Sequence, residues 1–189
     1  MTSGVLALQG DFDVHRKRLE VLGAKVVLVR KAEQLNGLDS LVIPGGESTT
    51  LLKLLESGGF LDRLRDFVST KPTLGTCAGA ILMATVVDNP PQPSLGVLDI
   101  HVRRNGYGRQ IDSTIEIAST QKLDGPPLEL VFIRAPKIIG TGPGVEVLAT
   151  RRGEPVLVRQ GKMLAATFHP ELSIESRVHK CLLAMARSQ

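Results

Sequence analysis

Short apolar strands and amphipathic helices alternate along the first half of the chain, and this alternation constrains the fold more than any other feature. Each apolar run is short and bounded by turn residues, and the segment after it repeats its apolar residues at helical spacing. Repeated strand–helix units are typical of a mostly parallel sheet with helices on both faces. We expect strands at Val5–Leu8, Lys25–Val29, Ser40–Ile43 and Thr73–Gly75. We expect a helix that Asp11 caps and that runs to Leu22, helices at Ser48–Glu56 and Phe60–Val68, and the start of another at Ala80–Ala84.

The pattern changes after a proline-rich segment, Val86–Pro93, which we expect to be a loop. Beyond it, short strand-like runs separated by turn residues indicate antiparallel additions to the sheet. Gly140–Gly144 precedes a strand instead of opening a helix, so we interpret it as a turn and not as a dinucleotide-binding loop. The expected elements are strands at Val97–Val102, Ser113–Ile117, Leu130–Ile133, Val145–Ala149, Pro155–Arg159 and Met163–Thr167, and a final helix at Ile174–Ala186.

A length of 189 residues predicts a single domain over residues 1–189. Hydrophobic residues make up 42% of the chain and aromatic residues only 3%, which suits a globular core but not a base-stacking surface. Basic residues are scattered, so the net charge of +4 predicts a solvated surface, with a docking face for an acidic partner as the alternative. We expect no nucleic acid partner, no membrane span and no signal peptide, and hence a cytoplasmic protein.

The cysteine and histidine patterns argue against structural cross-links. Cys77 and Cys181 lie far apart in sequence, and we expect both to be free thiols in a reducing compartment. The four histidines show no spacing typical of metal ligands. We therefore predict no metal site.

The segment Gly75-Thr-Cys-Ala-Gly79 is the strongest local signal for chemistry. A nucleophile on a sharp strand-to-helix turn requires small residues two positions before and after it. The helix N-terminus after Cys77 favours a thiolate, and the N–H of Ala78 would face a developing oxyanion. The alternative is a structural cysteine in a glycine-rich turn.

Phe168-His-Pro-Glu171 supplies the residues that such a cysteine lacks. Pro170 favours extended backbone at His169, which places His169 and Glu171 on the same side. The carboxylate would then orient the imidazole, whose other nitrogen would accept the thiol proton. Read alone, a His followed by a Glu is more often surface than catalytic.

Pro44-Gly-Gly-Glu-Ser48 connects a predicted strand to a predicted helix. Its two glycines would let a backbone N–H approach a ligand closely, so Gly46 is a candidate second oxyanion donor. The alternative is a plain turn with Ser48 as the N-cap, and both interpretations can hold together.

Taken together, these motifs resemble the class I glutamine amidotransferases, and within them the glutaminase subunits of pyridoxal 5′-phosphate synthases. The general motifs are Gly75–Gly79 and Phe168–Glu171. Pro44–Thr50 and Phe132–Pro136 are narrower and point to the subfamily; Gly4–Gly10 and Arg104-Asn105 with Gly108–Gln110 also carry the resemblance. The resemblance implies an α/β, flavodoxin-like three-layer sandwich with a mostly parallel central sheet and antiparallel additions.

The resemblance also implies a role for each site residue. Cys77, His169 and Glu171 would form a catalytic triad that hydrolyses L-glutamine to L-glutamate and ammonia, without a cofactor. The oxyanion hole would use the N–H groups of Gly46 and Ala78. The glutamine site would be lined by Gly46, Glu47, Ser48, Arg104, Ile133 and Arg134.

Two features near the proposed glutamine site are less regular. Arg104 would pair with the substrate α-carboxylate, a planar contact that suits a guanidinium; read alone, Arg104 and Arg134 are surface charges. Gly106-Tyr107 replaces the Ala or Ser followed by Phe that is usual in the family.

We expect no catalytic role for the other histidines, His15, His101 and His179.

Ammonia chemistry predicts a partner, because free ammonia protonates in water and then loses its nucleophilicity. The resemblance implies a (β/α)₈-barrel synthase subunit in a large hetero-oligomeric complex that makes pyridoxal 5′-phosphate. It also implies that the lone glutaminase chain is weakly active or inactive. Reorientation of the Gly45–Gly46 peptide on docking would explain this.

Two other classes of protein share part of the pattern. Another cysteine hydrolase, such as a peptidase or deglycase-like protein, has the same turn but does not require Arg104 or Arg134. A regulatory subunit with a vestigial site is the non-enzyme alternative, which the intact set of Cys77, His169 and Glu171 disfavours. An α/β-hydrolase is disfavoured because its acid usually precedes its histidine.

Overall fold

The computed structural model describes residues 1–106, 114–120 and 122–188. Among these residues, a nine-stranded sheet has the order β2-β1-β3-β4-β12-β11-β10-β7-β8. The first five strands in this order are parallel, and the other four extend the sheet with antiparallel pairs. The mostly parallel sheet with antiparallel additions is therefore confirmed. Its strands are β1 (Thr2–Leu6), β2 (Lys25–Val29), β3 (Ser40–Ile43), β4 (Thr73–Thr76), β7 (Thr114–Thr120), β8 (Leu128–Phe132), β10 (Glu146–Arg151), β11 (Glu154–Gln160) and β12 (Met163–Ala166).

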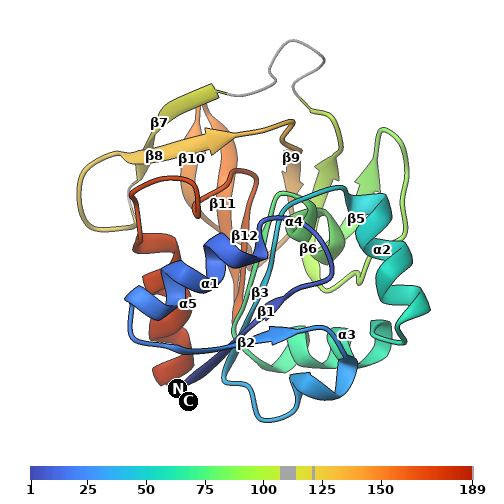
Figure 1. Ribbon diagram of the computed structural model, residues 1–189. Helices are drawn as coiled ribbons and strands as arrows, with labels where there is room; N and C mark the ends of the chain where they lie inside the picture. Colours follow the sequence, from blue (N-terminus) through green and yellow to red (C-terminus); the bar gives the residue numbers. More distant parts are fainter. Residues whose placement is uncertain (107–113, 121, 189) are drawn as a thin grey trace.

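Helices cover both faces of the parallel part of this sheet, as Figure 1 shows. On one face, α1 (Phe12–Val21) and α5 (Arg177–Arg187) lie together, and on the other lie α2 (Ser48–Ser57), α3 (Leu61–Thr70) and α4 (Ala78–Met83). Successive strand residues point to opposite faces, so Val42 joins the core under α1 and α5, whereas Leu41 and Ile43 join the core under α2, α3 and α4. The three-layer α/β architecture follows directly from this alternation.

A second sheet, of order β5-β6-β9, packs against the α2, α3 and α4 side through Leu98, Ile100 and Val102. Its strands are β5 (Ala84–Asp88), β6 (Leu98–Arg103) and β9 (Lys137–Thr141). Two predictions were wrong here. Ala84–Asp88 is not helix and loop, because it pairs in parallel with β6, and Gly140 lies in a strand, because it pairs with His101. Pairing partners decide strand formation more than local composition does.

Helix starts and strand ends also differ in detail from the predictions. Helix α2 begins at Ser48, as predicted, so the alternative in which Ser48 is the N-cap is wrong; Glu47 caps the helix by accepting hydrogen bonds from the N–H groups of Thr49 and Thr50. Asp11 makes no side-chain cap with α1. The first strand begins at Thr2, earlier than expected, because it pairs with β2 from that residue. A 3-10 helix at Ala32–Leu35 was not predicted.

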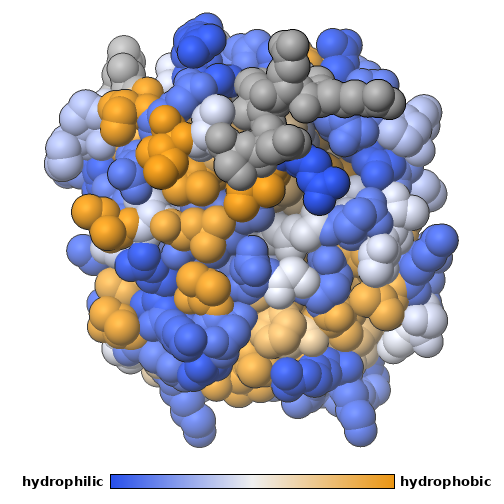
Figure 2. Space-filling view, turned by 45° about the horizontal axis from the view of Figure 1, so that its top comes forward, coloured by the Kyte–Doolittle hydropathy of each residue, from blue (hydrophilic) through white to orange (hydrophobic). Residues whose placement is uncertain are grey.

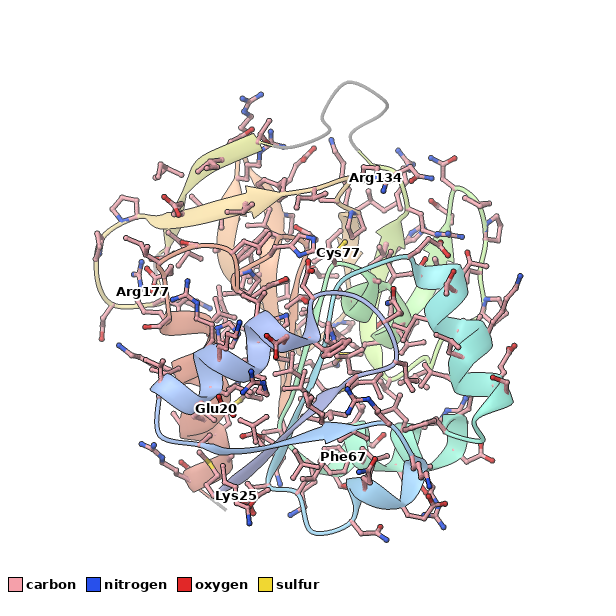
Figure 3. All side chains as sticks on the ribbon, viewed as in Figure 1. Glu20, Lys25, Phe67, Cys77, Arg134 and Arg177 are labelled. Carbon is pink, nitrogen blue, oxygen red and sulfur yellow. The ribbon has the colours of Figure 1, made fainter. Side chains whose placement is uncertain are left out.

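The parallel strands share one direction, so their carboxyl ends meet at one end of the sheet, and the segments after β3, β4 and β12 carry Gly46, Cys77 and His169. The register aligns Gly75 of β4 with Ile43 of β3 and with Ala165 of β12. In open α/β sheets, ligands bind outside the carboxyl ends of the strands. Figure 3 places Cys77 and Arg134 toward this end of the sheet, far from Lys25 at the other end.

The turn between β4 and α4 is closely packed on both sides. A Cβ at Gly75 would lie 2.7 Å from the carbonyl of Gly79 and from the sulfur of Met83, and a Cβ at Gly79 would overlap the carbonyl oxygen of Ile43. The packing therefore requires glycine at positions 75 and 79, where the sequence pattern predicted small residues. Within the described part of the chain, no helix combines the length and apolarity needed to cross a membrane.

We predict that Gly79→Ala lowers the free energy of unfolding by about 3 kcal/mol, the upper end of the usual cost of overpacking, because the backbone of β3 cannot retreat without breaking sheet pairing. The matched control is Gly140→Ala, whose added Cβ would meet only the Cβ of His101 at 3.5 Å. Urea denaturation of both variants measures the difference. Equal stability of the two variants would contradict the packing argument.

Candidate active site

Cys77 occupies a strained position at the end of β4. Its φ of 48° and ψ of −102° are unusual for a residue with a Cβ. Its backbone N–H donates to the carbonyl oxygen of Ala166 at 2.8 Å, so the end of β12 holds the turn. Ala78, the first residue of α4, follows directly and is fully buried. The geometry matches the sharp strand-to-helix turn that presents a nucleophile.

His169 and Glu171 follow β12 and form a buried pair. Glu171 Oε1 lies 2.7 Å from His169 Nδ1, and the exposed fractions of the two residues are 4% and 0%. The backbone N–H of His169 donates to the carbonyl oxygen of Val131 at 2.8 Å, which ties this loop to β8. The predicted orientation of the imidazole by the carboxylate is present in the structure.

The charge state of His169 is set by competing effects. Burial disfavours the charged imidazole, but hydrogen bonds with Cys77 and Glu171, and the charges of both groups, outweigh it and raise the pKa of His169 to about 10. The imidazolium is therefore the stable form at neutral pH. This is the state expected for a histidine that has taken the proton of a neighbouring thiol.

Gly45 packs closely against the side chains of His169 and Cys77. A Cβ at residue 45 would lie 2.5 Å from His169 Cε1 and 3.2 Å from the Cβ of Cys77. Even an alanine would push the imidazole away, so the first glycine of the pair is required by the site itself. Beside it, the backbone N–H of Glu47 donates to Gln9 Oε1 at 3.1 Å, which links this turn to the segment after β1.

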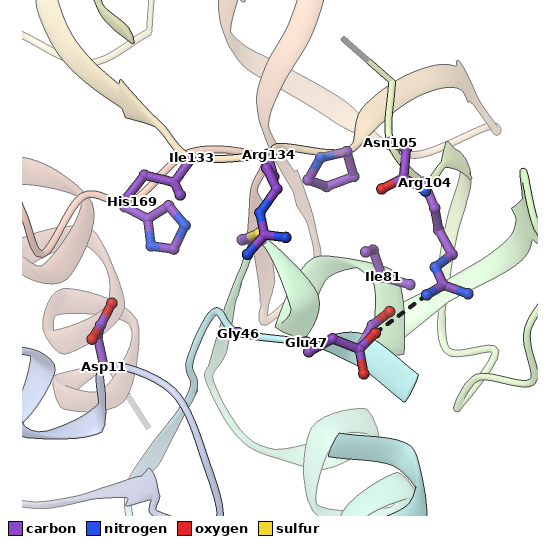
Figure 4. A pocket seen from close by; sticks show the side chains of 12 residues that line it. Asp11, Gly46, Glu47, Ile81, Arg104, Asn105, Ile133, Arg134 and His169 are labelled. Carbon is purple, nitrogen blue, oxygen red and sulfur yellow. Dashed lines mark hydrogen bonds and ion pairs between the residues drawn. The ribbon is translucent and has the colours of Figure 1, made fainter. Parts of the chain in front are cut away.

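A cavity of about 210 Å³ opens beside Cys77 and His169. It brings together most of the predicted site residues: Gly46, Glu47, Ser48, Cys77, Arg104, Ile133, Arg134 and His169 (Figure 4). Glu171 and Ala78 are fully buried and do not line it. Four further lining residues were missed by the sequence analysis: Asp11, Ile81, Asn105 and Pro136.

The cavity carries both signs of charge. Arg104 donates to Thr49 Oγ1 at 3.0 Å and lies 3.4 Å from Glu47 Oε1, and in Figure 4 Arg134 points into the space between His169 and Arg104. Only 13% of the Arg104 side chain is exposed, which differs from the surface position considered as an alternative. Burial opposes ionisation of Glu47, but the N–H groups of Thr49 and Thr50 outweigh it and lower the pKa of Glu47 to about 2.

The loop motif near Arg104 is only partly visible. Tyr107 and Gly108–Gln110 lie outside the described residues. Gly106 packs closely on Lys137, since a Cβ there would lie 2.7 Å from the Cβ of that lysine.

Asp11, His169 and Glu171 each place a possible metal-ligand atom within 4.8 Å of the others. His169 Nδ1 and Glu171 Oε1 are already hydrogen-bonded to each other, so a metal ion bound there would have to replace this hydrogen bond. Cys77 and Cys181 are both free thiols.

Two histidines without an expected role lie behind the site. His15 and His179 are both fully buried, and their ring nitrogens lie 3.0 Å apart. Their place in the fold was not predicted, because α1 and α5 are far apart in the sequence and meet only through packing on the same face of the sheet.

The fold and site define a glutamine amidotransferase. The chain belongs to the SNO glutamine amidotransferase family, whose model matches residues 5–188. The chain is 63% identical to pyridoxal 5′-phosphate synthase subunit PdxT of Koribacter versatilis, over 100% of this chain and 97% of the relative. It is 52% identical to the protein of the same name from Solibacter usitatus, over 96% and 97% of the two chains.

Solved structures agree with this assignment. A structure described as a glutamine amidotransferase superposes with a TM-score of 0.91 at 48% identity and covers 98% of both chains. A Thermoplasma acidophilum protein described as part of a GMP synthase shares the fold, with a TM-score of 0.70 at 19% identity over 100% of this chain and 94% of its own. The predicted family is confirmed.

We predict that Glu171→Gln lowers the titration midpoint of His169 by about one pH unit or more, because the amide removes the negative charge beside Nδ1. NMR titration of the His169 ring measures the change, and we expect a wild-type midpoint near 10. Since the folded pKa lies above the ordinary value of 6.5, the stabilisation from this pair is complete below pH 6.5 and is lost as the pH rises through 10. An unchanged midpoint would show that Glu171 does not hold the charge of His169.

Proposed function

We propose that this chain hydrolyses L-glutamine to L-glutamate and ammonia through a thioester on Cys77. The observation that carries the proposal is the placement of a strained cysteine beside a buried His169–Glu171 pair, at the wall of a cavity with groups for both charges of an amino acid. Membership of a glutamine amidotransferase family supports the same reaction.

Each step uses a group whose environment suits it. The Cys77 thiolate attacks the side-chain amide carbon, and the carbonyl oxygen gains the negative charge. The N–H groups of Ala78 and Gly46 would stabilise this oxyanion. His169 then gives its proton to the amide nitrogen, ammonia leaves, and a thioester remains. His169 next takes a proton from water, whose oxygen attacks the thioester and releases glutamate and the thiol.

Substrate recognition would use the charged wall of the cavity. Arg104 is placed for the α-carboxylate, because a guanidinium binds a carboxylate through two parallel N–H donors. Glu47 suits the α-ammonium group, since its low pKa keeps it ionised. Ser48, Ile133 and Arg134 complete the walls.

The ammonia would pass to a synthase subunit that makes pyridoxal 5′-phosphate. The names of the relatives support this partner, and the motifs of the sequence support a (β/α)₈-barrel subunit in a large hetero-oligomeric complex. Exposed apolar side chains also suit a docking surface: Ile115 and Ile117 of β7 are 69% and 64% exposed, and Figure 2 shows several apolar patches on the face viewed there. Residues 1–189 would act as one domain, in the cytoplasm, where Cys77 stays reduced.

We predict that Cys77→Ala abolishes glutamate release from L-glutamine, by at least about 10³-fold, because no other thiol reaches the amide carbon. Release is measured with the chain alone and with the synthase subunit. Cys181→Ala is the control, since Cys181 lies on α5, and it should retain the wild-type rate. Release that survives Cys77→Ala would refute the thioester mechanism.

We predict that Arg104→Ala raises the KM for glutamine by about tenfold or more and changes kcat less, because a charge-assisted contact to the bound substrate is lost. Arg104→Lys should fall between wild type and Arg104→Ala, since an ammonium keeps the charge but not the planar fork. Steady-state kinetics of the complex separate the two constants. An unchanged KM in both variants would remove Arg104 from the glutamine site.

A further inference from the structure

The buried pair of His15 and His179 lies directly behind Glu171. His15 Nδ1 lies 3.0 Å from His179 Nε2, and His15 Nε2 lies 3.3 Å from Glu171 Oε2 and 3.3 Å from Thr76 Oγ1. His15 thus touches the residue that precedes Cys77 and the residue that orients His169. Neither histidine lines the cavity, so neither can contact a substrate there.

The second oxygen of Glu171 has an unusual environment. Oε1 is hydrogen-bonded to His169, but Oε2 is buried and accepts no well-aligned hydrogen bond from the described residues. His15 Nε2 is the ring nitrogen that faces it. A buried carboxylate oxygen without a donor is costly, so a proton on His15 Nε2 is strongly favoured.

Placing that proton determines the rest of the network. A neutral imidazole carries one N–H, so a protonated Nε2 leaves His15 Nδ1 as an acceptor. The neighbouring His179 Nε2 must then be the donor, and its Nδ1 is left bare. His179 Nδ1 is in fact buried without a hydrogen-bond partner among the described residues, which fits this assignment.

The surroundings keep both rings neutral. Burial, and then the neighbouring His179 and His169, lower the pKa of His15 well below its usual value. Burial and the charge of Arg18 lower the pKa of His179 to about 4. A neutral His15 with its proton on Nε2 would offer Glu171 a donor at 3.3 Å without adding a second positive charge that competes with the His169 imidazolium.

Helix α1 also holds the backbone of the same loop. The guanidinium of Arg18 donates to the carbonyl oxygens of Glu171 and Ser173. One helix therefore contacts both the main chain and the side chain of Glu171, through residues three positions apart.

We propose that His15 is a positioning residue that holds Glu171 through its Nε2–H, and that His179 selects the tautomer of His15 that can do so. The proposal rests on the proposed roles of Cys77, His169 and Glu171. Removing the His15 donor would let the Glu171 carboxylate turn away, and the His169 imidazolium would lose part of its support.

Matched substitutions separate the donor from the packing. In His15→Gln the amide nitrogen can occupy the position of Nε2 and donate to Glu171, whereas His15→Leu fills a similar volume without a donor. His179→Gln and His179→Leu make the same comparison, with and without a donor, at the histidine that contacts His15. They leave His15 in place and so test the network even where His15→Leu does not fold.

Two measurements on the full-length variants test the proposal. NMR titration of the His169 ring should show a lower midpoint in His15→Leu and a midpoint near that of the wild type in His15→Gln. In the complex with the synthase subunit, His15→Leu should lower kcat for glutamine about tenfold, with KM within about twofold, and His15→Gln should retain most of kcat. His179→Leu should move both readouts in the same direction as His15→Leu, by less, and His179→Gln should move them least.

The outcomes are distinct. A wild-type midpoint and kcat in His15→Leu, or equal losses in His15→Leu and His15→Gln, would overturn the proposal and leave His15 a packing residue. Where His15→Leu does not fold, wild-type values in His179→Leu would overturn it. Absence of glutamine hydrolysis in the wild-type complex would instead reject the proposed function, and the His169 midpoint would still decide the role of His15.

Discussion

The close approach of α4 to β3 leaves room only for hydrogen at residue 79, because a Cβ there would overlap the carbonyl oxygen of Ile43. This contact sets the angle at which the chain leaves β4. The turn between β4 and α4 therefore consists of one residue, Cys77, which takes a positive φ. Everything else in the site is arranged around the sulfur that this turn presents.

The imidazole of His169 is confined on several sides. Gly45 lies against its ring, Glu171 holds Nδ1, and the N–H to Val131 anchors its backbone. The electrostatic cost of burying a charged ring is offset by the carboxylate and by Cys77. The strained backbone of Cys77 and the charged ring of His169 lie next to each other, and the strand ends around them hold both in place.

Glu47 and Arg104 lie across the cavity from His169 (Figure 4). Glu47 caps α2 and contacts Arg104, so the same carboxylate stabilises a helix and shapes the pocket. Arg104 comes from the end of β6 in the small sheet, whereas Glu47 comes from the large one. The second sheet therefore contributes to the site as well as to the core.

The local motifs of the sequence were sufficient for the turn at Cys77, the pairing of His169 with Glu171 and the parallel strands whose ends meet there. Each depends on residues within a few positions of one another, where backbone sterics act directly. The strands β5 and β9 were missed because Ala84–Asp88 runs into a proline-rich segment and Lys137–Thr141 into a glycine-rich one, and both form strands by pairing with β6. Ser48 was one possible cap of α2 from the sequence, but Glu47 has that role, because its side chain accepts hydrogen bonds from the N–H groups of Thr49 and Thr50.

The amino-acid sequence by itself determined the family, the layered α/β class and the residues with reactive side chains. Tertiary structure alone decided which of these residues share a cavity, how far Arg104 is buried, and that His15 lies against Glu171. The physical reason is that the cavity wall and the histidine pair join residues from distant elements. Their approach depends on how whole helices pack on the sheet, and no short stretch of sequence encodes that packing.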